Sequence, residues 1–219
     1  MHINRADLAP PGVGLGLAIV AWTCLVAGGM GLLIHYGAKP GAAGNPPTTW
    51  PADSLLPADE DQDRLLVFLH PRCPCSRATL RQLERAMAHR RGRPIEVQAI
   101  VFTPSGREGH WSQTDLFQSA AQMPGWRVFA DADGRETRRF GIRTSGQVLM
   151  FDAQQRLVFS GGVTPGRGHE GASVGLDALI ALLRGDEPGH ERAPVYGCPI
   201  FQQLTESSAQ EVAQCPCSE

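Results

Sequence analysis

The fold is decided by residues 64–80, which read RLLVFLHPRCPCSRATL. Residues 65–69 are a short, wholly apolar run, which predicts a buried strand. Residues 70–74 carry two prolines and predict a turn. From Ser76 onward apolar side chains recur at helical spacing, with arginines on another face, and Gly92 and Pro94 are expected to stop the helix. The stretch therefore predicts a strand, a turn and a helix in direct succession.

Two cysteines, Cys73 and Cys75, lie where the predicted strand gives way to the helix. The first turn of a helix offers unpaired N–H groups and the positive end of the helix dipole. A thiol there loses its proton more readily, and the thiolate is both the nucleophile and the metal ligand. Pro74 between them suits the first helical position. The pattern favours a reactive pair over two structural cysteines, which usually have apolar neighbours.

The rest of the domain continues this alternation of strands and helices. A second strand is expected at residues 95–102, which makes a βαβ unit with parallel pairing. Further elements are expected as a helix at 112–122 with Ser112 as N-cap, a strand at 126–130, a short basic helix within 131–140, a hairpin of strands at 147–151 and 156–160, and a helix at 176–183. This order predicts an α/β fold, a mixed sheet flanked by helices on both faces.

An apolar segment at residues 12–36 precedes the domain and is long enough to cross the roughly 30 Å hydrocarbon layer as a helix. The alternative is a cleaved signal peptide, with an apolar region of about 7–15 residues and a small-residue cleavage site, which GAAG at 41–44 would supply. The length favours an uncleaved transmembrane anchor. Arg5 and Lys39 flank opposite ends of the segment and leave its orientation open. With an exported domain as the default for a lone N-terminal anchor, we expect a single-pass protein of the cell membrane with its domain on the extracytoplasmic side.

The expected organisation has five parts: an N-terminal segment at 1–11, the anchor at 12–36, a flexible linker at 37–63, the α/β domain at 64–186 and a Cys-rich tail at 187–219. The linker is rich in proline, glycine and acidic residues and shows no apolar period. The net charge of −2 gives no reason to expect a nucleic-acid partner.

The tail carries Cys198, Cys215 and Cys217, and its Cys-Pro-Cys tripeptide repeats that of the domain. These thiols would resolve a disulfide made by Cys73 and Cys75, or complete a thiolate site for copper(I) or zinc. The third alternative is a tail with incidental thiols. The spacing matches no standard zinc-ribbon or iron–sulfur pattern.

Residues 64–184 resemble the thioredoxin superfamily, in which a nucleophilic cysteine stands at the helix start, as Cys73 does here. Residues 141–151 resemble the family's segment leading into its fourth strand. More specifically, HPRCPCSRAT at 70–79, GGVT at 161–164 and RGHEG at 167–171 resemble membrane-tethered RedB-type thioredoxin-like proteins. The resemblance implies thiol–disulfide exchange on protein partners, with no cofactor.

Two positions depart from the family pattern. Ser76 takes the place of the usual second cysteine, so that the partner thiol moves to Cys75. Gly146, preceded by Ser145, takes the place of a cis-proline that normally shields the thiols and blocks metal binding. Its loss leaves room for a metal or a larger substrate. A disulfide across one residue, between Cys73 and Cys75, is expected to be strained and hence oxidising.

His70, three residues before Cys73, would assist thiolate formation, bind metal or serve only in the turn. Arg167 and His169 belong to a glycine-rich loop that either lies near the site or is solvated. The first functional hypothesis is a membrane-anchored thiol–disulfide oxidoreductase, with Cys73 attacking and Cys75 resolving. The second is a copper- or zinc-binding protein on the same fold. A peroxidase ranks third, because His70 occupies the place of the threonine that peroxiredoxins carry.

Overall fold

The computed structural model describes residues 11–57, 61–91, 94–105 and 114–201, and the chain divides into two units, 1–39 and 40–219. The first unit holds helix α1 (Pro11–Ala38), whose apolar side chains are exposed. Its stretch Gly14–Ala38 has a mean hydropathy of 2.2 and is long and apolar enough to cross a membrane. The apolar helix expected at residues 12–36 is therefore present.

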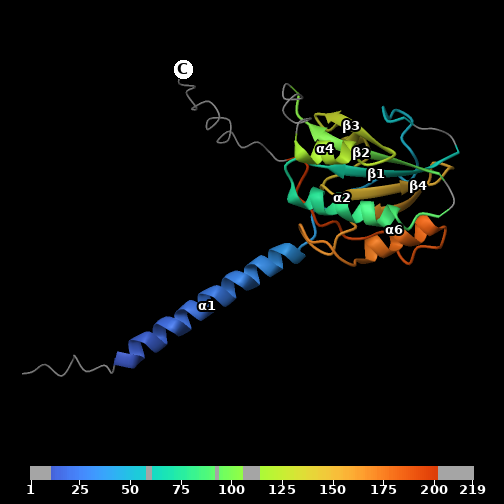
Figure 1. Ribbon diagram of the computed structural model, residues 1–219. Helices are drawn as coiled ribbons and strands as arrows, with labels where there is room; N and C mark the ends of the chain where they lie inside the picture. Colours follow the sequence, from blue (N-terminus) through green and yellow to red (C-terminus); the bar gives the residue numbers. More distant parts are fainter. Residues whose placement is uncertain (1–10, 58–60, 92–93, 106–113, 202–219) are drawn as a thin grey trace, which may run out of the picture. The chain divides into compact units, whose positions relative to one another are not determined.

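The second unit is built on a five-stranded sheet (Figure 1). Its strands are β1 (Asp63–Leu69), β2 (Ile95–Thr103), β3 (Trp126–Ala132), β4 (Gln147–Phe151) and β5 (Leu157–Gly161). They lie in the order β3-β2-β1-β4-β5. Strands β1, β2 and β3 are parallel, while β4 runs antiparallel to both β1 and β5. The predicted βαβ unit and hairpin are both confirmed, and β1 is the central strand.

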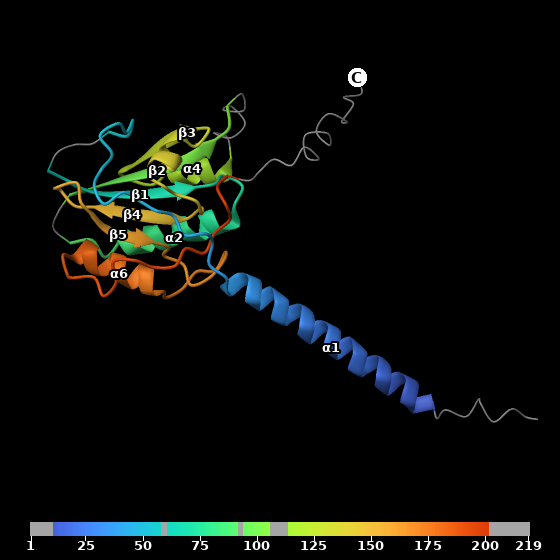
Figure 2. The same cartoon turned by 180° about the vertical axis from the view of Figure 1, so that it is seen from behind.

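Three helices cover one face of this sheet: α2 (Pro74–Met87), α4 (Asp115–Ala121) and α6 (Val174–Arg184). Figures 1 and 2 show the sheet from its two sides. Alternate residues of β1 point to opposite faces, so that Leu65 and Val67 pack with these helices while Leu66 and Phe68 pack on the other face. The short helix α5 (Arg135–Arg139) contacts β2 and β3. The predicted mixed sheet flanked by helices is confirmed.

The start of α4 differs from the prediction. The expected helix ran from residue 112 with Ser112 as its cap, but Ser112 lies outside the described residues and α4 begins at Asp115. Thr114 is the N-cap, and its hydroxyl accepts a hydrogen bond from the N–H of Phe117. Threonine suits this role as serine does, so the predicted cap type is kept at a position two residues later than Ser112.

Residues 40–57, expected to belong to a flexible linker, pack against the sheet. Trp50 and Leu56 are buried in the core of the face opposite α2. The Trp50 ring meets those of Phe140 and Phe151 edge-on, with centroids 5.2 and 5.3 Å apart. Two buried side chains in an irregular, proline-rich backbone produce no helical or strand period of apolar residues. The sequence pattern therefore suggested a flexible linker.

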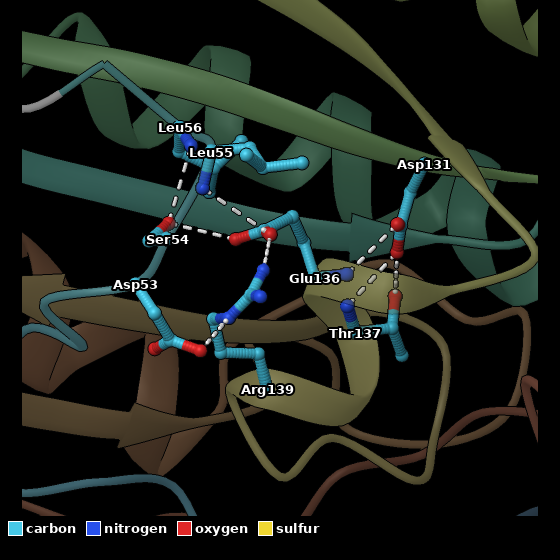
Figure 3. A network of polar contacts seen from close by, with 8 residues as sticks. All are labelled: Asp53, Ser54, Leu55, Leu56, Asp131, Glu136, Thr137 and Arg139. Carbon is cyan, nitrogen blue, oxygen red and sulfur yellow. Dashed lines mark hydrogen bonds and ion pairs between the residues drawn. The ribbon is translucent and has the colours of Figure 1, made fainter.

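Polar contacts through α5 hold this segment in place (Figure 3). The Ser54 hydroxyl donates to the carboxylate of Glu136 at 2.7 Å, and the N–H of Leu55 donates to the same carboxylate at 3.3 Å. Arg139 pairs with Glu136 and with Asp53, the latter at 2.9 Å. Because Glu136 is fully buried, these partners are what allow its charge to lie there.

The expected tail also begins inside the folded unit. Arg192 forms a parallel bridge with Ser160 of β5, and Val195 and Ile200 are buried. The folded unit therefore extends beyond the boundaries expected at residues 64 and 186, at both ends. Residues 202–219, with Cys215 and Cys217, lie outside the described residues.

Two neighbouring leucines test whether residues 40–57 belong to the fold. Leu56 is 3% exposed and Leu55 is 63% exposed. We expect Leu56→Ala to lower the free energy of unfolding by about 2–4 kcal/mol, because it leaves a cavity in the core. Leu55→Ala is the matched control and should change it by less than about 0.5 kcal/mol. Equal effects of the two variants in denaturant unfolding would show that the segment is a tether.

Candidate functional site

Cys73 is the N-cap of α2 and follows directly on the turn that ends β1. Its N–H donates to the carbonyl of His70 at 3.0 Å, and its own carbonyl accepts from the N–H of Ser76 at 3.1 Å. The Ser76 hydroxyl accepts from the N–H of His70 at 3.1 Å, which ties the turn to the helix. Pro74 lies in the first turn, where a missing N–H costs no hydrogen bond.

Three cysteine side chains meet at this point. The sulfur atoms of Cys73, Cys75 and Cys198 all lie within 4.8 Å of one another. All three thiols are free, and Cys73 and Cys75 are each 3% exposed. Cys198, which the sequence proposed as a resolving thiol or metal ligand, thus reaches the site, whereas Cys215 and Cys217 lie outside the described residues.

Ser145 connects Cys73 to the segment that carries Cys198. Its hydroxyl donates to the sulfur of Cys73 at 3.3 Å and accepts from the N–H of Cys198 at 3.2 Å. Its backbone N–H donates to the carbonyl of Cys198 at 2.9 Å. One serine therefore makes contact with two of the three cysteines.

Gly146 is required at its position for two reasons. Its φ of +84° lies in the left-handed region, and a Cβ there would come 2.6 Å from the hydroxyl of Thr79. Its N–H also donates to the carbonyl of Phe68 at 2.7 Å, a bond that proline lacks the donor to make. No peptide bond in the described part of the chain is cis. A glycine with a positive φ and a trans peptide bond therefore stands where the thioredoxin-like proteins that the sequence resembles carry a cis-proline.

The three thiols differ sharply in acidity. The pKa of Cys73 is lowered to about 4, chiefly by a hydrogen bond from the Cys75 thiol, with further bonds from Ser145, Cys198 and the N–H of Ser76 outweighing the effect of burial. The pKa of Cys75 is raised well above its usual range, because its thiol donates to Cys73 and because it is buried. Burial, and then the bond to Cys73, raises the pKa of Cys198. At neutral pH the site thus holds one thiolate and two thiols.

His70 organises the turn and lies close enough to Cys73 for an electrostatic interaction. Its Nδ1 accepts from the N–H of Arg72 at 3.3 Å, and its ring stacks on Phe102 with centroids 5.9 Å apart. Burial lowers the pKa of His70, so that the imidazole is neutral at neutral pH. Within the described ranges, the group of potential metal ligands found here contains the three cysteines without His70.

The glycine-rich loop after β5 lies against the site. The guanidinium of Arg167 donates to the carbonyl of Gly197, next to Cys198, and the N–H of Gly168 donates to the sulfur of Cys75. His169 is exposed, and its Nδ1 lies 2.8 Å from the carbonyl oxygen of Arg167, within its own loop. The structure thus brings Arg167 to the site, whereas the contact shown for His169 is local.

Sequence reasoning missed three residues that shape the site. Gly168 contributes only its N–H, and Thr79 contributes a hydroxyl that donates to the carbonyl of Cys75 at 3.1 Å. Gly197 allows a close approach, because a Cβ there would lie 1.9 Å from the carbonyl oxygen of Ser145. No sequence pattern identifies a backbone donor such as Gly168 in a loop. The glycine directly before Cys198, in contrast, could have indicated a close backbone approach at that cysteine.

No protein-family model and no curated protein matches the sequence. Among solved structures, the fold is similar to an uncharacterized conserved protein from Geobacillus kaustophilus, with 18% identity, a TM-score of 0.52, and coverage of 77% of this chain and 94% of that one. A hypothetical protein from Sinorhizobium meliloti gives 22% identity and a TM-score of 0.49 over 67% of this chain and 82% of that one.

A secreted disulfide oxidoreductase from Mycobacterium tuberculosis, described as homologous to DsbE of E. coli, gives 14% identity and a TM-score of 0.39 over 56% of this chain and 83% of that one. At these identities the likenesses concern the fold alone. The five-stranded mixed sheet with its flanking helices agrees with the fold class that the sequence predicts.

Ser145 offers a direct test of how the thiolate is stabilised. Replacing it by alanine removes a donor that favours the charged form, so the pKa of Cys73 should rise from about 4 by about one unit. The measurement is a pH titration of thiolate absorbance in the reduced protein. Ser160→Ala is the control, because that hydroxyl accepts from Gln147 instead of touching a sulfur. A Ser145 variant that titrates like this control would contradict the assignment.

Proposed function

We propose that this chain is a membrane-anchored thiol–disulfide oxidoreductase that acts on the thiols or disulfides of other proteins through Cys73 and Cys75. The observation that carries the proposal is the sulfur of Cys73 at the start of α2, which accepts a hydrogen bond from Ser145 and lies within 4.8 Å of the Cys75 sulfur, an arrangement that lowers the pKa of Cys73. A thiolate at neutral pH is the nucleophile of disulfide exchange. The HPRCPCSRAT motif, which resembles RedB-type proteins, supports the same role.

The reaction proceeds in two exchanges. The thiolate of Cys73 attacks one sulfur of a substrate disulfide, whose S–S bond breaks, and the departing substrate thiolate takes a proton. Cys75 then loses its proton and attacks the sulfur of Cys73, which releases the second substrate thiol. The substrate disulfide gains two electrons and Cys73 and Cys75 form a disulfide. The reverse sequence oxidises a substrate dithiol.

The acidities of the two thiols suit this order of events. The pKa of Cys75 is high mainly because its thiol donates to the charged Cys73. Once Cys73 is held in a mixed disulfide, that charge is gone and the pKa of Cys75 should fall toward its usual range. Cys75 therefore keeps its proton until it is needed as the resolving nucleophile. The exchange requires no cofactor.

Helix α1 would hold the protein in the cell membrane, because its apolar stretch is long enough to span the hydrocarbon layer. The domain would lie on the extracytoplasmic side, where disulfides form and persist. Its partners would be proteins whose cysteines reach the start of α2.

The decisive experiment compares single cysteine variants. Cys73→Ser should abolish exchange with a disulfide-bonded peptide, a loss of at least about a hundredfold, because serine is not a thiolate nucleophile. Cys75→Ser should still form the mixed disulfide with the peptide. Cys24→Ser, in α1, is the control and should exchange at the wild-type rate. Exchange that survives in the Cys73 variant would refute the proposal.

Metal binding is the second candidate, and the three converging sulfur atoms favour it. Cys73, Cys75 and Cys198 could supply three thiolates to copper(I), which prefers soft sulfur ligands, and zinc is the other candidate. The absence of a shielding proline at Gly146 is consistent with access for an ion. Anaerobic copper(I) titration should then give one ion per chain, with at least about tenfold weaker binding in Cys198→Ser. Equal binding by that variant would exclude this site.

A further inference from the structure

We infer that Cys198 is a third redox thiol of the site and that it forms a disulfide with Cys73 in the oxidised protein. This inference rests on the proposed function, because it needs Cys73 as the nucleophile. It assigns the oxidised state to a pair of cysteines far apart in the sequence, in place of the two that share the Cys-Pro-Cys tripeptide.

The backbone around Cys198 runs alongside the turn that leads into β4. The N–H of Ile200 donates to the carbonyl of Arg143 at 3.0 Å, and Pro199 forms an antiparallel bridge with Thr144. The carbonyl of Cys198 accepts from the N–H of Ser145 at 2.9 Å. The segment thus pairs with the backbone edge at residues 143–145, the mode by which many domains bind extended peptides. Here the chain's own segment occupies the edge beside Cys73.

Further contacts hold residues 195–200 in place beside Ser145. The carbonyl of Val195 accepts from the N–H of Gly41 at 2.8 Å, and the carbonyl of Gly197 accepts from Arg167. Gly197 permits the approach, since any side chain there would collide with Ser145. Val195 and Ile200, on either side of Cys198, are 7% and 1% exposed. The position of Cys198 is thus determined by packing on both sides.

The side chains complete the arrangement. The sulfur of Cys198 lies within 4.8 Å of those of Cys73 and Cys75, and its thiol shares a hydrogen bond with Cys73. Forming a bond requires the two sulfur atoms to close to about 2.05 Å, with suitable torsion angles. Because the backbones that carry the two cysteines are already held side by side, closing this distance needs side-chain rotation and a small backbone adjustment.

The exchange that leads to this bond is balanced without another reactant. Suppose that resolution by Cys75 has first produced the disulfide between Cys73 and Cys75. Cys198 loses its proton and attacks the sulfur of Cys73, the bond to Cys75 breaks, and the sulfur of Cys75 takes up the proton. No electrons leave or enter the protein. A bridge across one residue is strained and labile, so the exchange runs toward the bond between Cys73 and Cys198.

The test maps the disulfide in the full-length chain in detergent. The protein is equilibrated in a glutathione redox buffer, its free thiols are alkylated, and it is cut with trypsin and a glutamate-specific protease. Cysteines 73 and 75 then share peptide 73–77, and Cys198 lies alone in peptide 193–206, separate from Cys215 and Cys217. We expect the dominant linked species to join these two peptides. Cys75→Ser should retain the link, and the double variant Cys215→Ser, Cys217→Ser is the matched control that should also retain it.

Cys198→Ser should move the bond inside peptide 73–77 and require about tenfold more oxidised glutathione for the same extent of oxidation. A wild-type protein with its bond inside peptide 73–77 and Cys198 alkylated would overturn the inference and leave the proposed function standing. Lack of any disulfide at Cys73, in wild type and variants alike, would overturn both. Fragmentation of the linked wild-type species shows which of Cys73 and Cys75 carries the alkyl group, so the wild-type map decides without requiring any variant to fold; an alkylated Cys73 in that species would overturn the inference.

Discussion

The site depends on the hydrogen bonds that a buried thiolate receives at the start of α2. Burial alone would raise the pKa of Cys73, yet its pKa is lowered to about 4 because donors converge on its sulfur. These donors come from three parts of the chain: the first turn of α2, the turn before β4 at Ser145, and the C-terminal segment at Cys198. Each of these parts of the chain adds to the stabilisation of the charge, with the Cys75 hydrogen bond making the largest contribution, which links reactivity to the complete fold.

Segments outside the central βαβ unit help to position the groups that donate hydrogen bonds to Cys73. Residues 191–201 run from the edge of β5 to the turn at Ser145, and Gly41 at the start of the second unit holds them through Val195. The loop after β5 is fixed from α2, where Arg81 and Arg85 pair with Glu170 at 3.0 and 2.8 Å. From there its Gly168 reaches Cys75. The Cys-Pro-Cys motif is thus held in place by backbone segments that lie far from it in the sequence.

The parts of this structure that were predictable are those with local causes. The apolar run of β1, the prolines of the turn and the helical spacing of α2 suffice to place Cys73 and Cys75 at a helix start. Ser145 and Gly146 were located only through the resemblance to a family, because the contact of Ser145 with Cys73 joins residues 72 positions apart in the sequence. Trp50 and Leu56 escaped prediction since irregular backbone leaves no period, and the role of Cys198 depends on a long-range pairing that no spacing reveals.

The central claim is that Cys73 is a thiolate at neutral pH because hydrogen bonds outweigh burial. A pH titration of thiolate absorbance in the fully reduced wild-type protein, taken as the difference from Cys73→Ser, measures this directly. The account predicts a midpoint at about 4. A midpoint near the ordinary thiol value of about 8.5 would contradict it, because the converging donors would then have no net effect on the charge.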